Sequence, residues 1–196
     1  MTAQASTSVV ELRQDGDVLL VSVNNPPVNA LGAAVRQGLM AAMEQADASA
    51  AVKAVVIVGE GKAFIAGADI REFGKPPVQP LLPDVCNRIE ACSKPVVAVI
   101  HGAALGGGLE IAMSAHYRLA LPGAKLGLPE VSLGLLPGAG GTQRAPRLMG
   151  VKAATELMLS GQQIGAKAGL AAGLVDKLDD GTDPVAAGLA YARELL

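Results

Sequence analysis

Three short apolar runs constrain the fold of this chain most. They are Val18–Val23, Val55–Val58 and Pro95–Ile100, and they consist almost wholly of β-branched and aliphatic residues. Runs of this kind are typical of short strands that are buried on both faces of their sheet. Segments with apolar residues at helical spacing separate them. The alternation of buried strands with helices predicts an α/β fold.

Helical spacing is clearest from Leu31 to Ala46, where Val35, Leu39 and Met43 continue one apolar stripe. Four prolines within residues 75–83 predict an irregular, mobile surface loop. No linker or internal repeat divides the chain, so residues 1–196 are predicted to form one domain. Further helices are predicted over residues 83–93, 107–115, 141–149, 152–160, 166–172 and 183–196, further strands over 117–120 and 174–177, and a disordered start over 1–8.

Composition argues against several classes of function. The net charge of −2 gives no electrostatic reason to expect a nucleic-acid partner. No apolar run approaches the ~18 residues that span a membrane, so no membrane partner is predicted. The N-terminus lacks the basic and apolar regions of a signal peptide. Cys86 and Cys92 are not spaced as a redox pair and are interpreted as reduced thiols of a cytoplasmic protein.

Two glutamates lie within glycine-rich segments. Glu110 ends the segment 101–110, which contains three consecutive glycines, and Glu130 precedes the glycine-rich segment 136–144. Glycines allow a ligand to approach the backbone closely, and a helix that begins among them directs its first N–H groups at that ligand. A carboxylate within a turn can reach the same point. This layout predicts an enzyme with an oxyanion-stabilising site and acid/base carboxylates.

Other motifs fail on the residues that they require. A dinucleotide fingerprint needs G-x-G-x-x-G, and each candidate lacks its last glycine. A phosphate-binding loop is excluded because Ala63 follows Lys62, and a nucleophile elbow is excluded because Glu130 stands where its first glycine should be. His101 and His116 have no supporting ligand pattern, so no metal site is predicted. His101 is interpreted as a strand-end residue that hydrogen-bonds to a loop.

Three motifs, taken together, resemble the crotonase (enoyl-CoA hydratase/isomerase) family. They are Phe64–Ile70, Gly102–Glu110 and Pro129–Arg144, and the resemblance runs from about Val9 to Lys177. The stretches 25–31 and 144–150 are most similar to the hydratase/isomerase part of multifunctional β-oxidation enzymes. The resemblance implies a spiral of ββα units, with two roughly perpendicular sheets surrounded by helices.

Family members also have further C-terminal helices that cover the acyl pocket. Because this chain ends at Leu196, we expect those helices to be missing and a C-terminal extension to raise its activity. We also expect the apolar residues of segment 183–196 to need a surface on which to pack. The assemblies that the resemblance implies are a homotrimer or hexamer, or covalent continuation into a 3-hydroxyacyl-CoA dehydrogenase part.

The resemblance implies an enoyl-CoA hydratase of fatty-acid β-oxidation, with 3,2-enoyl-CoA isomerisation as a second activity. It assigns the oxyanion-stabilising N–H groups to Ala68 and Gly107. It gives Glu110 the task of orienting and deprotonating water, and Glu130 that of supplying the α-proton. Coenzyme A enters as part of the acyl-CoA substrate, and no cofactor is implied. Its contacts are assigned to Lys62, Ala66, Ala68, Asp69, Ile70, Arg71 and Gly107.

Alternative functions remain at this point. Other reactions of the family are acyl-CoA hydrolysis and decarboxylation, and a non-catalytic acyl-CoA-binding module would use the same glycine-rich segments. A relative of the Clp-type serine proteases, which share the spiral fold, is disfavoured because the serine nucleophile frame is absent and both glutamates are present. Acyl chain length cannot be predicted from these residues.

Overall fold

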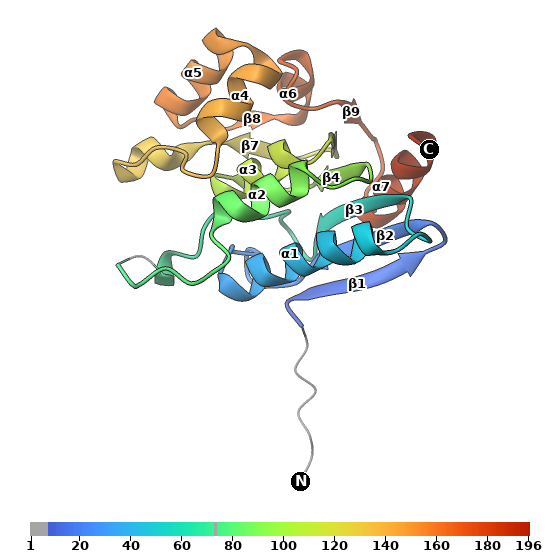
Figure 1. Cartoon of the computed structure of the whole chain (residues 1–196). Coiled ribbons are helices and arrows are strands. Elements are labelled where there is room, and N and C mark those ends of the chain that lie inside the picture. The colour runs from blue at the N-terminus through green and yellow to red at the C-terminus, as the bar shows by residue number, and fades with distance from the viewer. Residues whose placement is uncertain (1–7, 73) are drawn as a thin grey trace.

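The computed structural model describes residues 8–72 and 74–196, so most of the predicted disordered start lies outside the described residues. Two sheets form the centre of the molecule (Figure 1). The larger sheet has the strand order β1-β2-β3-β4-β6-β9, and the smaller has the order β5-β7-β8. The strands are β1 (Val10–Asp15), β2 (Val18–Val23), β3 (Ala54–Gly59), β4 (Val96–Ile100), β5 (Ala103–Leu105), β6 (Tyr117–Ala120), β7 (Lys125–Gly127), β8 (Ile164–Gly165) and β9 (Lys177–Leu178).

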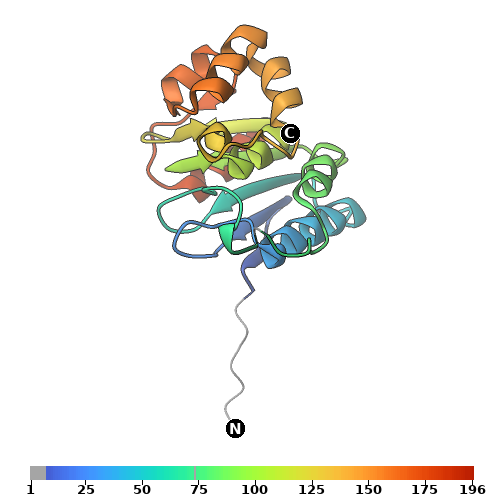
Figure 2. The same cartoon turned by 90° about the vertical axis from the view of Figure 1, so that its left-hand side faces the viewer.

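Helices surround the two sheets. Helices α4, α5 and α6 gather at the end of the molecule remote from α1 (Figures 1 and 2). None of the helices in the described residues has the length and apolarity needed to span a bilayer. The helices are α1 (Ala33–Ala48), α2 (Leu82–Glu90), α3 (Gly107–Ser114), α4 (Gly141–Met149), α5 (Val151–Ser160), α6 (Ala166–Ala171) and α7 (Pro184–Glu194), with 3-10 turns η1 (Ile70–Glu72) and η2 (Pro129–Leu133).

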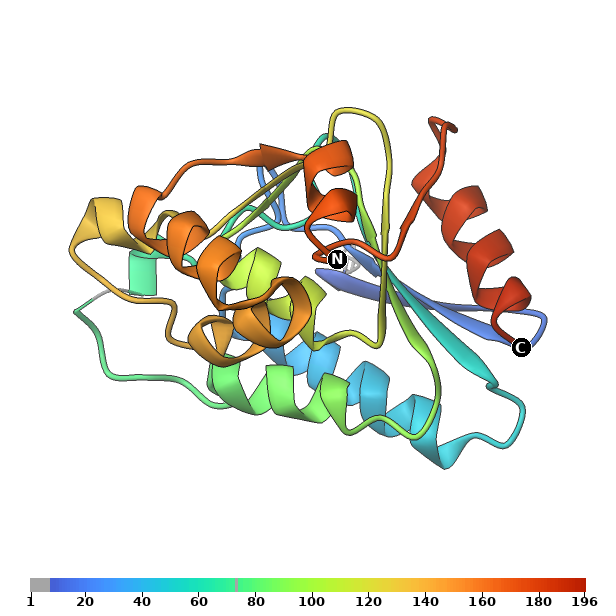
Figure 3. The same ribbon diagram turned by 90° about the horizontal axis from the view of Figure 1, so that it is seen from above.

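The two faces of the larger sheet enclose separate apolar clusters. Side chains alternate between the faces along a strand, and β2 divides accordingly: Leu19 and Val21 join one cluster with α1, while Val18 and Leu20 join another with α7. Helices α1 and α7 therefore cover opposite faces (Figure 3). The buried strands β2, β3, β4 and β6 are parallel, with β2 paired to β3 and β3 to β4. The predicted α/β alternation is confirmed.

The chain passes repeatedly from the larger sheet to the smaller sheet and then to a helix. Strand β4 leads through β5 to α3, and β6 leads through β7 and η2 to α4. Each passage ends with a glycine-rich connection at the start of a helix. This repetition delivers Glu110, in α3, and Glu130, in η2, to one end of the smaller sheet.

Several predicted bounds are wrong for identifiable reasons. The first helix begins at Ala33 rather than Leu31, because Leu31 forms a β-bridge with Ala68. The last strand begins at Lys177 rather than Leu174. The N–H groups of Leu174 and Val175 both donate to the Gly169 carbonyl in α6, so they are not available to pair with a neighbouring strand. Strands β1, β5, β7 and β8 were not predicted; the last three have only two or three residues and carry no detectable period.

Helix α7 has a surface to pack on within this chain. It lies against β2, β3 and β4, and Gly188 fits where an added Cβ would come within 2.6 Å of Val99 and 2.7 Å of Val56. The expectation that segment 183–196 needs a surface is met by the larger sheet. On this helix Leu189, Tyr191 and Ala192 are buried.

The interpretation of His101 as a strand-end residue that hydrogen-bonds to a loop is confirmed through its backbone. It follows β4 directly, as predicted for a strand-end residue. Its ring nitrogens are buried, however, and neither makes a hydrogen bond with the described residues. The backbone carbonyl of His101 makes the link to the neighbouring loop instead, by accepting from the Phe64 N–H at 2.9 Å.

Candidate active site

A cavity of about 200 Å³ lies where three glycine-rich connections meet. Segments 66–70, 105–107 and 129–135 form its walls, which are mostly apolar. Of the residues that the sequence assigned to the site, the structure brings five to this cavity. These are Ala66, Ala68, Ile70, Gly107 and Glu130.

The peptide group between Gly67 and Ala68 is held by its oxygen. The Leu31 N–H donates to the Gly67 carbonyl at 2.9 Å. Because the C=O and N–H of a trans peptide point in opposite directions, the Ala68 N–H is directed away from Leu31. No described atom accepts a hydrogen bond from it. Ala68 therefore presents a fixed, free donor beside the cavity.

Gly107 supplies a second donor. It is the first residue of α3, and its N–H has no intrahelical partner and no other acceptor among the described residues. A Cβ at this position would lie 2.7 Å from Leu82 Cδ2, 3.1 Å from Leu31 Cδ1 and 3.7 Å from the Ala68 nitrogen. A side chain here would have to displace the ends of Leu82 and Leu31, and the position lies close to the Ala68 nitrogen.

Glu110 does not itself line this cavity, and two backbone N–H groups around the start of α4 hold its carboxylate. Its Oε1 accepts from the N–H groups of Ala139 at 2.7 Å and Gly141 at 2.8 Å. The residue is 2% exposed. Burial raises the pKa of Glu110, and the two N–H donors and the Arg144 charge offset part of that rise. No described donor bonds Oε2, so this second oxygen is the one free for chemistry.

Glu130 reaches the cavity from η2. Its Oε2 is buried without a hydrogen-bond partner among the described residues. Burial raises the pKa of Glu130, and the nearby charge of Glu110 raises it further. Gly106 is the close neighbour, since a Cβ there would lie 3.1 Å from Glu130 Oε1. An unpaired buried carboxylate is costly, so this group favours its protonated form.

The sequence reasoning did not assign the loop that holds Glu110. Ala139 and Gly141 supply the two N–H groups, and the Arg144 guanidinium donates to the Ala139 carbonyl at 2.9 Å. Arg144 also pairs with Glu90 at 2.6 Å, which ties the loop to α2. The signal was the glycine-rich segment 136–144, but nothing local in it indicates which carboxylate it holds.

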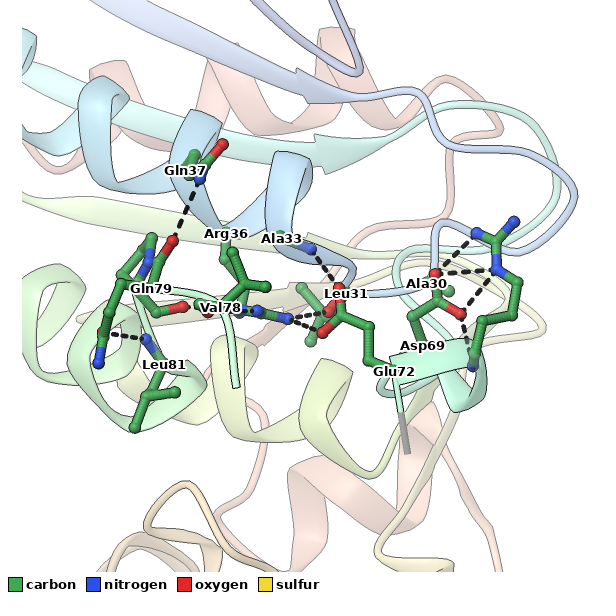
Figure 4. Close-up of polar contacts among 12 residues, drawn as sticks. Ala30, Leu31, Ala33, Arg36, Gln37, Asp69, Glu72, Val78, Gln79 and Leu81 are labelled. Carbon is green, nitrogen blue, oxygen red and sulfur yellow. Dashed lines mark hydrogen bonds and ion pairs between the residues drawn. The ribbon is translucent and has the colours of Figure 1, made fainter. Parts of the chain in front are cut away.

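The other residues assigned to coenzyme A lie outside the cavity. The Asp69 carboxylate is buried and pairs with Arg71 at 2.7 Å (Figure 4). The hydrogen-bonded Arg71 guanidinium lowers the pKa of Asp69 to about 2. Asp69 lines a neighbouring cavity of about 310 Å³ with Leu31. Lys62 is exposed and lines neither cavity.

The described residues contain no group of three His, Cys, Asp or Glu side chains placed to hold a metal ion. The arrangement instead offers two free N–H donors and the Glu130 carboxyl at a cavity with mostly apolar walls, with the buried Glu110 carboxyl near Glu130. The pKa values of both carboxyls are raised. Such donors stabilise an oxygen on which negative charge develops. Two neighbouring carboxyls whose ionisation is coupled suit a reaction that removes one proton and delivers another.

Comparison with known proteins identifies the family. The family model described as enoyl-CoA hydratase/isomerase matches residues 13–196. The peroxisomal bifunctional enzyme of Danio rerio is 52% identical over 163 residues, which cover 83% of this chain and 23% of that protein. A probable enoyl-CoA hydratase of Bacillus subtilis is 45% identical over 175 residues, which cover 86% of this chain and 68% of that protein.

A solved structure of enoyl-CoA hydratase from Bacillus anthracis has a TM-score of 0.90 and is 32% identical, and the alignment covers 95% of this chain and 76% of that chain. The crotonase-type α/β fold predicted from the sequence is thereby confirmed. The chain spans about a quarter of the length of the peroxisomal relatives that it matches, 23% for the Danio rerio protein. The match over residues 13–196 and the shared fold show that this chain belongs to the enoyl-CoA hydratase/isomerase family of enzymes.

Proposed function

We propose that this chain catalyses the addition of water across the 2,3 double bond of a trans-2-enoyl-CoA in fatty-acid β-oxidation. The observation that carries the proposal is that Glu130 lines the same cavity as Ala68 and Gly107, whose N–H groups are free, and that the buried Glu110 lies near enough for its charge to raise the pKa of Glu130. Family membership supports the same reaction. The names of its relatives include both enoyl-CoA hydratases and bifunctional enzymes.

The thioester carbonyl would accept hydrogen bonds from the Ala68 and Gly107 N–H groups. Withdrawal of electron density toward that oxygen makes C3 of the enoyl group electrophilic and stabilises the enolate that forms on attack. Each donor of this kind typically contributes ~10²–10³ in rate. The apolar walls lower the local dielectric around the donors, which strengthens these hydrogen bonds.

The two carboxyl groups would divide the proton transfers. Glu110 Oε2 accepts a proton from water as the oxygen of that water bonds to C3. The protonated Glu130 delivers its proton to C2, and the enolate collapses to the 3-hydroxyacyl thioester. The proton gained by Glu110 then restores the starting state by exchange within the pair or with solvent. Because the two carboxyl groups titrate as a unit, this assignment of roles to Glu110 and Glu130 describes one of the ways in which the pair can share its proton.

Coenzyme A contacts follow from the same placement. The cavity is lined by Ala66, Ala68 and Ile70. These residues would contact coenzyme A, either near the thioester or at the adenine. Arg71 is exposed and would meet the phosphates, with Asp69 holding its guanidinium. Lys62 is a surface cation farther along the same connection. No separate cofactor is needed, because coenzyme A enters with the substrate.

The wider setting is also proposed. The relatives named bifunctional and multifunctional support covalent continuation into a 3-hydroxyacyl-CoA dehydrogenase part, which would oxidise the product of hydration. Assembly into a homotrimer or hexamer stays a prediction. Cytoplasmic localisation also stays a prediction, because the relatives' names include both peroxisomal and bacterial proteins.

The experiment is hydration of crotonyl-CoA, followed by the loss of ultraviolet absorbance of the conjugated thioester. We expect turnover by the wild-type chain. Binding of crotonyl-CoA without turnover would contradict the proposal and favour the non-catalytic acyl-CoA-binding module. Turnover of a 3-enoyl-CoA without hydration would instead assign 3,2-isomerisation, and release of free coenzyme A thiol would assign hydrolysis.

A further inference from the structure

We infer that Arg36 is a positioning residue that aims the Ala68 N–H at the thioester and holds the neighbouring proline-rich loop closed against the site. The catalytic part of this inference rests on the proposed function. Arg36 lies in α1 and touches neither carboxyl group of the site, so no catalytic step is assigned to it. Its contacts nevertheless converge on the backbone from which the site is built (Figure 4).

The Arg36 guanidinium uses all three of its nitrogens. Nε donates to the Pro80 carbonyl at 2.7 Å, and Nη2 donates to the Val78 carbonyl at 2.8 Å. Nη1 donates to the Leu31 carbonyl at 2.8 Å and to the Glu72 carboxylate at 2.7 Å. We call this set of four contacts the Arg36 clamp. Arg36 is only 6% exposed, so the clamp is shielded from solvent.

Glu72 contacts α1 at a second point besides Arg36. Its Oε1 accepts from the Ala33 N–H at 2.7 Å, while its Oε2 accepts from Arg36. Gly32, the residue before the helix, has no side chain with which to cap it. A carboxylate at a helix N-terminus satisfies an otherwise free donor and complements the helix dipole. Glu72 therefore fixes η1, the turn that follows Ala68, on the start of α1.

Leu31 connects the clamp to the oxyanion donor. Arg36 holds the Leu31 carbonyl, and the Leu31 N–H holds the Gly67 carbonyl at 2.9 Å. That carbonyl belongs to the peptide group whose opposite end is the Ala68 N–H. A rotation of the Leu31 backbone would thus redirect the donor. Hydrogen bonding at the oxygen of a peptide also polarises its N–H, which improves it as a donor.

The clamp reaches the other side of the site through the proline-rich loop. Val78 and Pro80 lie in the loop between η1 and α2, and Gln37 adds a contact from its side-chain amide to the Gln79 carbonyl at 3.1 Å. The loop leads into Leu82, whose Cδ2 abuts Gly107. Both donors of the oxyanion site therefore have neighbours that the clamp holds.

The test compares Arg36→Met, Arg36→Lys and Glu72→Gln with the wild-type chain. Arg88→Met is the matched control. Arg88 also pairs with a carboxylate, Asp47 at 2.6 Å, and donates to a backbone carbonyl, that of Met43 at 2.9 Å. It lies in α2 and contacts no residue of the clamp. Glu72→Gln keeps an acceptor for Ala33 and alters a half-buried site, so it is the variant to use if Arg36→Met fails to fold.

Two readouts do not depend on turnover. Amide hydrogen exchange reports the order of segments 67–72 and 76–82. Isotope-edited infrared spectroscopy of bound butanoyl-CoA, labelled at its thioester carbonyl, reports how strongly the donors polarise that carbonyl. For Arg36→Met we expect faster exchange in both segments and loss of most of the carbonyl shift. Arg36→Lys should restore the shift only in part, because an ammonium group cannot match the planar guanidinium geometry.

Kinetics supplies the third readout. Misplacement of a reacting group by about 1 Å can cost ~10²-fold in rate, so kcat of Arg36→Met should fall by about 10-fold to 10²-fold. KM should change much less than kcat, and Arg88→Met should keep the wild-type values. A clamp variant that retains the wild-type carbonyl shift and exchange would overturn the inference. If the wild-type chain shows the carbonyl shift but no hydration, the proposed function fails. The inference about Arg36 is then tested by amide hydrogen exchange and by the infrared shift of the thioester carbonyl alone.

Discussion

Gly141 gives the sharpest single perturbation of the candidate site. Its N–H holds Glu110 Oε1 at 2.8 Å, and its Cα lies close to the same carboxylate. A Cβ at this position would lie 3.0 Å from Glu110 Oε1, 3.3 Å from Glu110 Cγ and 2.7 Å from Pro137 Cβ. Gly141→Ala should therefore move Glu110 without removing any ionisable group.

The size of the effect follows from these distances. Two carbon atoms make contact at ~3.5–4.0 Å, so the added methyl must displace Pro137 by about 0.8 Å and must also shift Glu110 by about a few tenths of an ångström. Overpacking of this kind costs about 1–3 kcal/mol in stability, and replacing glycine by alanine in a helix returns up to ~1 kcal/mol. We expect a net loss of ~0–3 kcal/mol, which leaves the protein folded. The rate should fall by about 10-fold to 10²-fold, because Glu110 no longer points at the water.

The assay pairs kcat for crotonyl-CoA hydration with Tm. Gly138→Ala is the matched control from the same loop, since a Cβ there would meet only the Leu136 carbonyl oxygen at 3.9 Å. It should keep the wild-type kcat. If Gly141→Ala folds and also keeps the wild-type kcat, the position of Glu110 does not limit the reaction, and the reasoning from this contact is refuted.

Two further predictions concern titration. Burial raises the pKa of Glu130 above its ordinary value of 4.5, so the folded state binds the proton more tightly than the unfolded state. This contribution to stability is complete below about pH 4.5 and is lost as the pH rises through the folded-state value. Glu130→Gln should therefore raise Tm at neutral and alkaline pH and lose that advantage below about pH 4.5, and a pH-independent difference in Tm would contradict this. Burial raises the pKa of the Cys86 thiol to about 12, so a thiol reagent should modify it only after denaturation; rapid modification of the native protein would disprove its burial.

The buried strands were the most predictable part of the fold. Val18–Val23 and Tyr117–Ala120 were predicted with the bounds that the structure has. Burial on both faces demands side chains that are apolar almost throughout, as in Val18–Val23. The edge strand β1 carries mostly exposed polar residues, and β8 has only two residues, so neither has a pattern to detect. Where a helix begins also depended on distant contacts, as Leu31 shows.

The residues of the candidate site likewise differ in how far the sequence could predict them. The two glutamates and the glycines around them were accessible to sequence reasoning, because a glycine-rich connection at a helix start has a local signature. The residues that hold the site in shape were not. Arg36 contacts carbonyls 42 and 44 positions away in the sequence, and the Ala139 N–H contacts Glu110 across 29 positions. Backbone carbonyls and N–H groups are the same in every residue, so no sequence pattern marks them as partners.

The central claim is that Glu110 and Glu130 act as one acid/base unit on a water held opposite the oxyanion donors. The most direct measurement is kcat for crotonyl-CoA hydration by Glu110→Gln, Glu130→Gln and the double variant. Each single variant should lose about 10²–10⁴ in kcat, and the double variant should lose little more than the worse single variant, because the two groups serve one reaction cycle. Acyl-CoA binding should persist in all three. Wild-type kcat in either single variant, with binding intact, would contradict the account.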